Sequence, residues 1–246
     1  MATTAAIIIT GTFLLAGLVK GVIGLGLPTV AVGLLTLVMA PAQAAALLVV
    51  PSLVTNLWQL LAGPRFTGLL RRLWGMMVGI LAGTAAGGGW LTGDASGRAT
   101  ALLGVALIVY AAVGLAAPKL HVPARIESWA SPVVGAITGL ISAATGVFVI
   151  PAAPYLQALA LDKEDLVQAL GLSFTVSTVA LAAVLARDGA LPVAIAGTSL
   201  LALAPALAGM ALGTWLRGRV GARVFRLCFF LGLGALGLHL AARAFL

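Results

Sequence analysis

Gly24-Leu25-Gly26-Leu27-Pro28 interrupts an apolar run that extends from about residue 5 to residue 39. One continuous helix over that run would measure about 50 Å, against about 30 Å for the hydrocarbon core of a bilayer. Glycine and proline end helices, so the run must break at this stretch. The run 131–161 carries a similar interruption at Thr145-Gly146-Val147-Phe148-Val149-Ile150-Pro151. The sequence therefore predicts two broken membrane helices.

The composition requires lipid as the solvent for most of the surface. Of the 246 residues, 62% are apolar and 8% are charged, whereas about 25% are charged in an ordinary soluble domain. Apolar stretches lie at about 5–39, 42–62, 73–92, 99–117, 131–161, 166–186, 190–216 and 224–245. We therefore expect an all-α, polytopic integral membrane protein in contact with the lipid bilayer. The basic residues fall between apolar stretches, so the formal charge of +8 indicates membrane orientation rather than nucleic-acid binding.

The two halves of the chain share a sequence pattern. Gly17-Leu18-Val19-Lys20 aligns with Gly139-Leu140-Ile141-Ser142, and residues 87–91 align with residues 212–216. The offset is about 122 to 126 residues, and the alternative is chance similarity between glycine-rich apolar sequences. We predict a duplication, with a first membrane repeat over 1–118, a cytoplasmic linker over 119–130 and a second membrane repeat over 131–246. Each repeat has about four apolar segments, and its first segment is broken or re-entrant at the Gly/Pro motif.

Basic residues predict that the two repeats are inverted. The loops at residues 65–72, 119–125 and 217–226 are all basic, so the positive-inside rule places them in the cytoplasm. Eight simple spans would put the last of these loops outside, whereas a re-entrant first segment in each repeat puts all of them inside. Both termini are then outside, and the acidic segment 162–165 lies inside. We further expect the two breaks to meet near the bilayer midplane.

At Gly17 to Pro28 and Gly139 to Pro151 the chain resembles the sulfite exporter TauE/SafE family, whose repeats open with a Gly-rich segment that runs into a proline. The similarity continues through residues 44–56, 152–159 and 166–178. The resemblance implies a transporter, and by family association an exporter, of sulfite, an organosulfonate or a related organic acid in the bacterial inner membrane. The chain departs from the family's usual run of three or more glycines, having Gly24-Leu25-Gly26 and a single Gly146.

The broken helices also predict a substrate-binding site, independently of the family resemblance. Their exposed backbone groups persist only where they line a cavity or are buried in protein, and a helix N-terminus after each break suits an anion. Lys20 is the one charge deep in an apolar segment, although a lysine can also snorkel to an interface. Asn56 is costly to bury unpaired, whereas Ser and Thr hydroxyls often bond their own helix. The candidate substrate-binding residues are Lys20, Gly24, Gly26, Pro28, Asn56, Thr145, Gly146, Pro151, Gln168 and Ser177.

Catalytic and metal sites are not expected. Neither His121 nor His239 has a partner at ligand spacing, Cys228 is the single cysteine, and no catalytic motif occurs. We therefore expect no cofactor and a small anionic substrate, carried by alternating access. A passive anion channel and a membrane-embedded enzyme are the alternative functions. The sequence leaves open the identity of the anion, the direction, the coupling ion and whether the protein is a homodimer.

Overall fold

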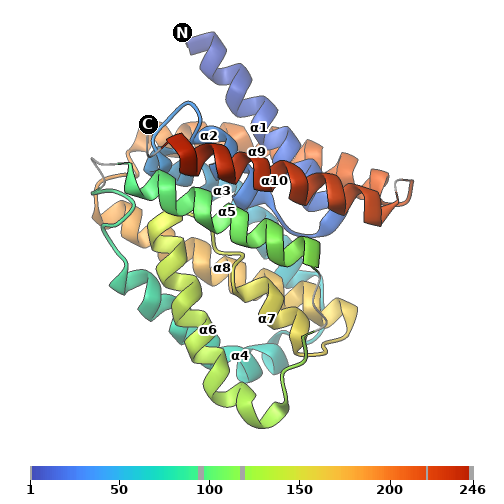
Figure 1. The fold of residues 1–246 in the computed structure, drawn as a ribbon. Helices are drawn as coiled ribbons and strands as arrows, with labels where there is room; N and C mark the ends of the chain where they lie inside the picture. Colours follow the sequence, from blue (N-terminus) through green and yellow to red (C-terminus); the bar gives the residue numbers. More distant parts are fainter. Residues whose placement is uncertain (1, 94–96, 117–119, 220, 244–246) are drawn as a thin grey trace.

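The computed structural model describes residues 2–93, 97–116, 120–219 and 221–243, and every regular element within these ranges is an α-helix (Figure 1). In chain order the helices are α1 (Ala2–Ile23), α2 (Leu27–Leu35), α3 (Pro41–Leu61), α4 (Phe66–Ala86), α5 (Arg98–Ala116), α6 (Ala124–Thr145), α7 (Ala152–Ala158), α8 (Lys163–Arg187), α9 (Val193–Arg217) and α10 (Ala222–Arg243). The all-α prediction is confirmed.

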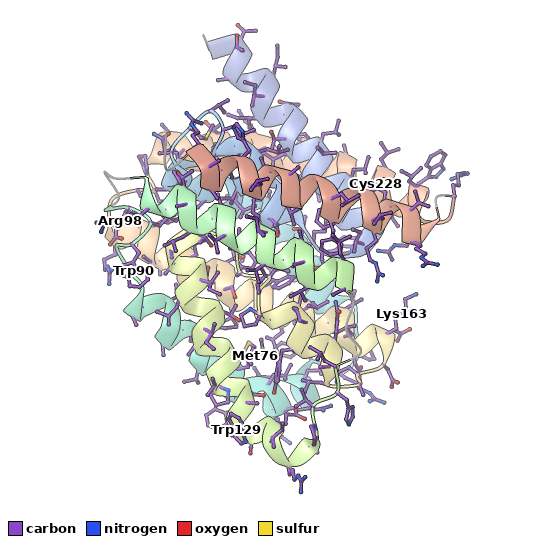
Figure 2. The ribbon with its side chains drawn as sticks, in the orientation of Figure 1. Met76, Trp90, Arg98, Trp129, Lys163 and Cys228 are labelled. Atoms are coloured by element: carbon purple, nitrogen blue, oxygen red, sulfur yellow. The ribbon has the colours of Figure 1, made fainter. Side chains whose placement is uncertain are left out.

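The outer surface of the helices is apolar. Within the described residues, α1, α3, α5, α8, α9 and α10 are long and apolar enough to cross a bilayer. Trp90 and Trp129 are 59% and 60% exposed, and Figure 2 shows both at the periphery, as it does Cys228. Many other large apolar side chains are also exposed. Such a surface is unfavourable in water and is solvated by lipid. The chain is a multi-pass membrane protein.

Both long apolar runs are broken at the expected stretches. In the first run α1 ends at Ile23 and α2 begins at Leu27, with Gly24 and Gly26 at φ values of 85° and 101°. Side chains other than glycine are strained at such angles. In the second run Gly146, at φ 74°, ends α6, and Pro151 immediately precedes α7. Both apolar runs are therefore interrupted at the predicted stretches.

The halves interlock through counterpart helices. α1 packs along α9 and α6 packs along α4, while α3 pairs with α8 and α5 with α10. By order along the chain, α1 to α5 correspond to α6 to α10. Under this correspondence the α1–α9 contact is equivalent to the α6–α4 contact, and the α3–α8 and α5–α10 pairs each join two corresponding helices. Each half therefore completes its packing with helices of the other half.

Counterpart helices run antiparallel. Gln168, near the start of α8, bonds Leu60 near the end of α3. Thr178, later in α8, bonds Ser52, which comes earlier in α3. Similarly, α5 begins beside the end of α10, where Gly104 lies against the backbone of Ala241.

Glycines allow the two lateral crossings to be close. A Cβ at Gly79 or Gly83 of α4 would lie closer than 3.0 Å to the backbone of α6, and a Cβ at Gly17 of α1 would meet the backbone of α9 in the same way. Backbones pack this closely in membranes at small residues. The spacing of glycines along residues 75–87 therefore serves helix packing.

Most charges gather at one end of the molecule. The end that holds the α3–α4, α7–α8 and α9–α10 turns carries Arg65, Arg71, Arg72, Arg125, Lys163, Arg217, Arg219, Arg223 and Arg226, and the other carries Arg98, Arg187 and Arg243. The start of α1 and the end of α10 lie away from the basic turns (Figure 1). One boundary differs from expectation, because Pro123 caps α6 and the helix begins at Ala124, inside the stretch predicted as a linker.

Candidate functional site

Lys20 lies inside the protein, in the last turn of α1, with 3% of its surface exposed. Its ammonium Nζ donates to Thr55 Oγ1 at 3.0 Å and to Asn56 Oδ1 at 2.5 Å, both on α3. None of the ion pairs among the described residues includes Lys20. The ammonium is therefore held by neutral oxygens, and its charge has no carboxylate partner there.

Asn56 connects this lysine to α8. Its Nδ2 donates to Ser52 Oγ at 3.0 Å and to Thr178 Oγ1 at 3.3 Å. Both hydroxyls are buried, and Ser52 and Thr178 are also within 3.2 Å of each other. We call Lys20, Ser52, Thr55, Asn56 and Thr178 the lysine cluster. It spans α1, α3 and α8 and lies where the two halves meet.

Pro51 positions the polar face of α3. A proline inside a helix has no N–H, so the carbonyl of Leu47 loses its intrahelical donor. Ser199 of α9 supplies the missing bond, since its Oγ donates to Leu47 O at 2.7 Å. The carbonyl of Pro51 in turn accepts a bond from Thr55 Oγ1 at 2.7 Å, which fixes the hydroxyl that faces Lys20.

The first break is closed by side-chain donors. Gln59 Nε2 donates to Gly24 O at 2.9 Å, and Arg217 Nε donates to Val22 O at 2.8 Å. Lys20 adds a positive charge at the same helix end, where the helix dipole is negative. The Val22 carbonyl at the end of α1 and the Gly24 carbonyl just beyond it thus accept bonds from α9 and α3, respectively.

The start of α2 offers free donors. Gly26 is its N-cap residue without a side-chain bond, and Pro28 lies in the first turn. Thr29 in the same turn is fully buried, and its hydroxyl has no hydrogen-bond partner. A helix N-terminus exposes N–H groups and the positive end of the dipole. This end of α2 is therefore suited to an anion.

The second break is satisfied only by its own backbone and one side chain. Gly146 N donates to Ser142 O at 2.8 Å, and Thr145 Oγ1 donates to Ile141 O and accepts from Val147 N. Gly146 also packs against α2 and α3, where a Cβ would meet Ala45 at 3.1 Å. The Thr145 hydroxyl is therefore fully engaged in ending α6.

The structure brings Lys20 and Asn56 together and separates the other predicted site residues. Gly24 contacts Gln59 near one end of α3, whereas Gly146 faces Ala45 near the other end, about 20 Å away at 1.5 Å per residue. Gly24 and Gly146 therefore lie on opposite sides of the lysine cluster along α3, so these two glycines do not meet there as we expected.

Gln168 lies away from the lysine cluster. Its amide donates to Leu60 O and Gly63 O and accepts from Arg65 N. These bonds close the end of α3, and all of them go to backbone. Ser177 of α8 is fully buried, and its hydroxyl has no partner. Pro151 lies at the far side of the second break, directly before α7.

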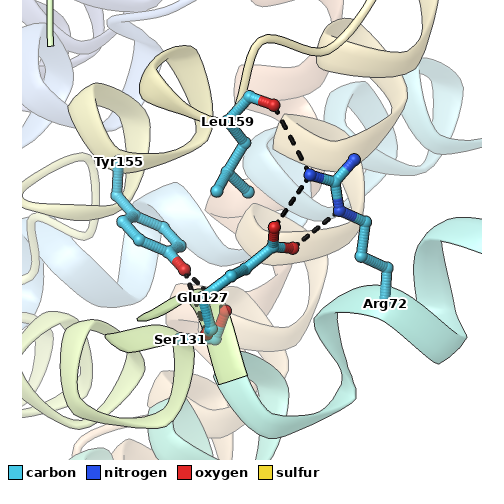
Figure 3. A network of polar contacts seen from close by, with 5 residues as sticks. All are labelled: Arg72, Glu127, Ser131, Tyr155 and Leu159. Atoms are coloured by element: carbon cyan, nitrogen blue, oxygen red, sulfur yellow. Dashed lines mark hydrogen bonds and ion pairs between the residues drawn. The ribbon is translucent and has the colours of Figure 1, made fainter. Parts of the chain in front are cut away.

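A polar network anchors the second broken segment (Figure 3). Arg72 of α4 pairs with Glu127 of α6 through bonds of 2.6 and 2.9 Å and also reaches Leu159 O after α7. Tyr155 of α7 bonds Ser131 of α6 at 2.7 Å. α7 is thereby tied to α6 and α4 at the basic end of the molecule.

Sequence reasoning passed over several residues of this site. Ser52, Thr55 and Thr178 are absent from the predicted site residues, because hydroxyls in membrane helices usually bond their own helix. The spacing of Ser52 and Asn56, one helical turn apart, was a signal that they share a face. The separation of 122 residues between Asn56 and Thr178 equals the repeat offset and was a second signal.

The fold and site together define a class. An all-helical, multi-pass membrane protein with an uncompensated cation and two interrupted helices at its centre has the architecture of a transporter. The family model of the sulfite exporter TauE/SafE matches residues 9–240, so the chain belongs to the TauE/SafE family of membrane transporters. Comparisons with the curated proteins and with the solved structures find no match.

Proposed function

We propose that the chain exports a small anion, of the sulfite, organosulfonate or organic-acid class, across the bacterial inner membrane. The observation that carries the proposal is the buried ammonium of Lys20, which is bonded only to the neutral oxygens of Thr55 and Asn56. A buried cation without a counter-ion is costly. A bound anion supplies the missing charge.

The anion has additional donors close to the first break. The free N–H groups at the start of α2 and the unpaired hydroxyl of Thr29 accommodate the oxygens of a sulfite or sulfonate. Asn56 holds the lysine and connects it to α8. The other predicted site residues, Gly24, Gly26 and Pro28, shape the backbone around these donors.

Alternating access between two inverted repeats is the mechanism we propose. The antiparallel counterpart helices support inversion, and the basic end supports a cytoplasmic position for the turns at Arg65 and Arg217. Lys20, Ser52 and Asn56 are at most 3% exposed. A closed centre favours a carrier over an open anion channel.

Ligand-dependent thermal unfolding tests the function. Purified protein is heated with sulfite, an alkylsulfonate, a carboxylate or chloride at constant ionic strength. We expect sulfite or the sulfonate to raise the unfolding temperature of the parent, because a ligand that binds the native state stabilises it. Lys20→Met should abolish the shift. If no anion in the panel discriminates the parent from Lys20→Met, the proposed site is wrong.

A further inference from the structure

The ends of the two broken helices differ in the groups that face them. In the first half, the end of α1 receives donors from Gln59 and Arg217 and carries the charge of Lys20. In the second half, the end of α6 has no basic residue in its last turn. Leu181 occupies the position that corresponds to Gln59 at the repeat offset. The second helix end therefore lacks the donors of the first.

Oxygen atoms predominate at the end of α6. Among the described residues, no side-chain donor bonds the carbonyls of residues 143–145, and Ser142 O accepts only from Gly146 N. These carbonyls carry the negative end of the helix dipole, about half an elementary charge. Both Ala143 and Ala144 are buried. A negative helix end without a cationic side chain attracts a positive ligand.

Two buried hydroxyls without hydrogen-bond partners lie on α6 and on α8, which packs against it. Ser142 and Ser177 are both 0% exposed, and neither Oγ has a hydrogen-bond partner. At the repeat offset of 122 they correspond to Lys20 and Thr55, which bond each other in the first half. They lie on α6 and α8, which are in contact. An unpaired hydroxyl in a protein interior is destabilising, so a ligand there would be favourable.

We propose that a sodium ion binds between α6 and α8, coordinated by Ser142 Oγ, Ser177 Oγ and the carbonyls at the end of α6. The ion takes in the second half the place that the Lys20 ammonium takes in the first. Hard cations select hydroxyl and carbonyl oxygens, and discontinuous membrane helices offer such oxygens at their C-terminal ends. The described residues hold no group of His, Cys, Asp and Glu for a divalent metal, and neutral ligands fit a monovalent ion.

The consequence for transport rests on the proposed function, whereas ion binding does not. The site joins α8, which bonds the lysine cluster through Thr178, to the second break. Sodium at this place neutralises the end of α6 and fixes α6 against α8. A sodium gradient then biases the arrangement of the helices that surround the anion.

Thermal unfolding of purified protein in NaCl, KCl or choline chloride, without sulfite or sulfonate, tests the site. We expect sodium alone to raise the unfolding temperature by about a few degrees. Ser142→Ala and Ser177→Ala should weaken the apparent sodium affinity by about tenfold or more. Thr175→Ala is the matched control on α8, because the Thr175 hydroxyl already bonds Gly171 O, and it should keep the parent response.

A second test replaces the proposed sodium ion by a positively charged side chain. Ser142→Lys places a tethered ammonium where we place sodium, so this variant should be as stable in choline as the parent is in sodium. Binding of radioactive sodium measures occupancy directly and should be lost in Ser177→Ala. Equal unfolding temperatures of the parent in all three salts, or an unchanged sodium response in both alanine variants, would overturn the proposal. Neither outcome depends on whether an anion is transported.

Discussion

The two breaks have similar backbone conformations but different side chains around them. Gly24 and Gly146 occupy corresponding positions, and both have positive φ values, 85° and 74°. The first break is met by Lys20, Gln59 and Arg217, all of them donors. The second is met by serine hydroxyls and free carbonyls. The two breaks thus share a backbone geometry, whereas one helix end is cationic and the other is rich in acceptors.

This difference distinguishes the two halves of the chain chemically. A membrane carrier with two identical half-sites would treat both ends of its path alike. Here the fixed charge lies beside the first break, near the end of α3 that faces the basic turns. The two halves therefore differ chemically at a few corresponding positions, and these positions are where the comparison is testable.

Removing the fixed charge is the strongest test. Lys20→Met keeps most of the side-chain stem. It leaves the last turn of α1 without a basic residue, like the last turn of α6. We expect anion transport into proteoliposomes or inside-out vesicles to fall on the order of 100-fold, because the substrate loses its buried counter-charge. Lys20→Arg should retain partial activity with altered geometry. Monodisperse purification of both variants checks folding, and parental transport by Lys20→Met would leave Lys20 a structural residue.

The lateral crossings, by contrast, should behave alike in both halves. Gly17 and Gly139 are counterparts, and a Cβ at either would lie closer than 3.0 Å to a backbone oxygen of the facing helix. We expect Gly17→Ala and Gly139→Ala each to lower the free energy of unfolding by about 1–3 kcal/mol, measured by thermal unfolding in detergent. Gly68→Ala is the control, since nothing lies within 4 Å of its Cβ position. A large effect in one half alone would contradict equivalent packing.

The sequence predicted the parts of the fold that follow from composition and backbone chemistry. Long apolar runs indicated membrane helices, and the glycines at positions 24, 26 and 146 located both breaks. The start of α6 was missed because Arg125 and Glu127 gave that turn the polarity of a loop. Polarity on its own does not separate a loop from a helix end at the membrane surface.

Only part of the candidate site was readable in the sequence. Lys20 and Asn56 were conspicuous because buried charge and amide groups are rare among apolar residues. Their mutual bond depends on how α1 packs against α3, which periodicity does not determine. Gln168 is also an amide in an apolar segment and looked equivalent to Asn56. It lies on α8 beside the turn that follows α3, so its partners are backbone carbonyls. The helix ends differ through tertiary donors such as Arg217, which no local pattern reveals.

Gln59→Leu sharpens the comparison of the breaks. The substitution gives the first half the leucine that the second half has at Leu181, and it leaves Gly24 O without its donor. Because the Gln59 Oε1 atom is itself unpaired, its removal offsets part of the loss. We expect a net destabilisation of about 1 kcal/mol, seen as a lower unfolding temperature, with a larger loss of transport than of stability. Leu181→Gln should weaken the response to sodium by adding a donor to the second break.

The smallest effect concerns Thr92, which corresponds to Arg217 at the offset of 125 but does not reach a broken helix. Thr92 Oγ1 donates to Asp188 Oδ2 at 2.7 Å, and this bond, with Arg187 nearby, lowers the pKa of the Asp188 carboxyl. A depressed native pKa stabilises the fold above the ordinary carboxyl pKa, and this contribution is lost as the pH falls through the native value. Thr92→Val should therefore reduce the unfolding temperature slightly at neutral pH, and the difference from the parent should vanish in acid. Thr198→Val, which removes an exposed hydroxyl bonded only to Ala194 O, should show no such pH dependence. A difference that persists unchanged in acid would mean that Thr92 acts through packing and not through the carboxylate.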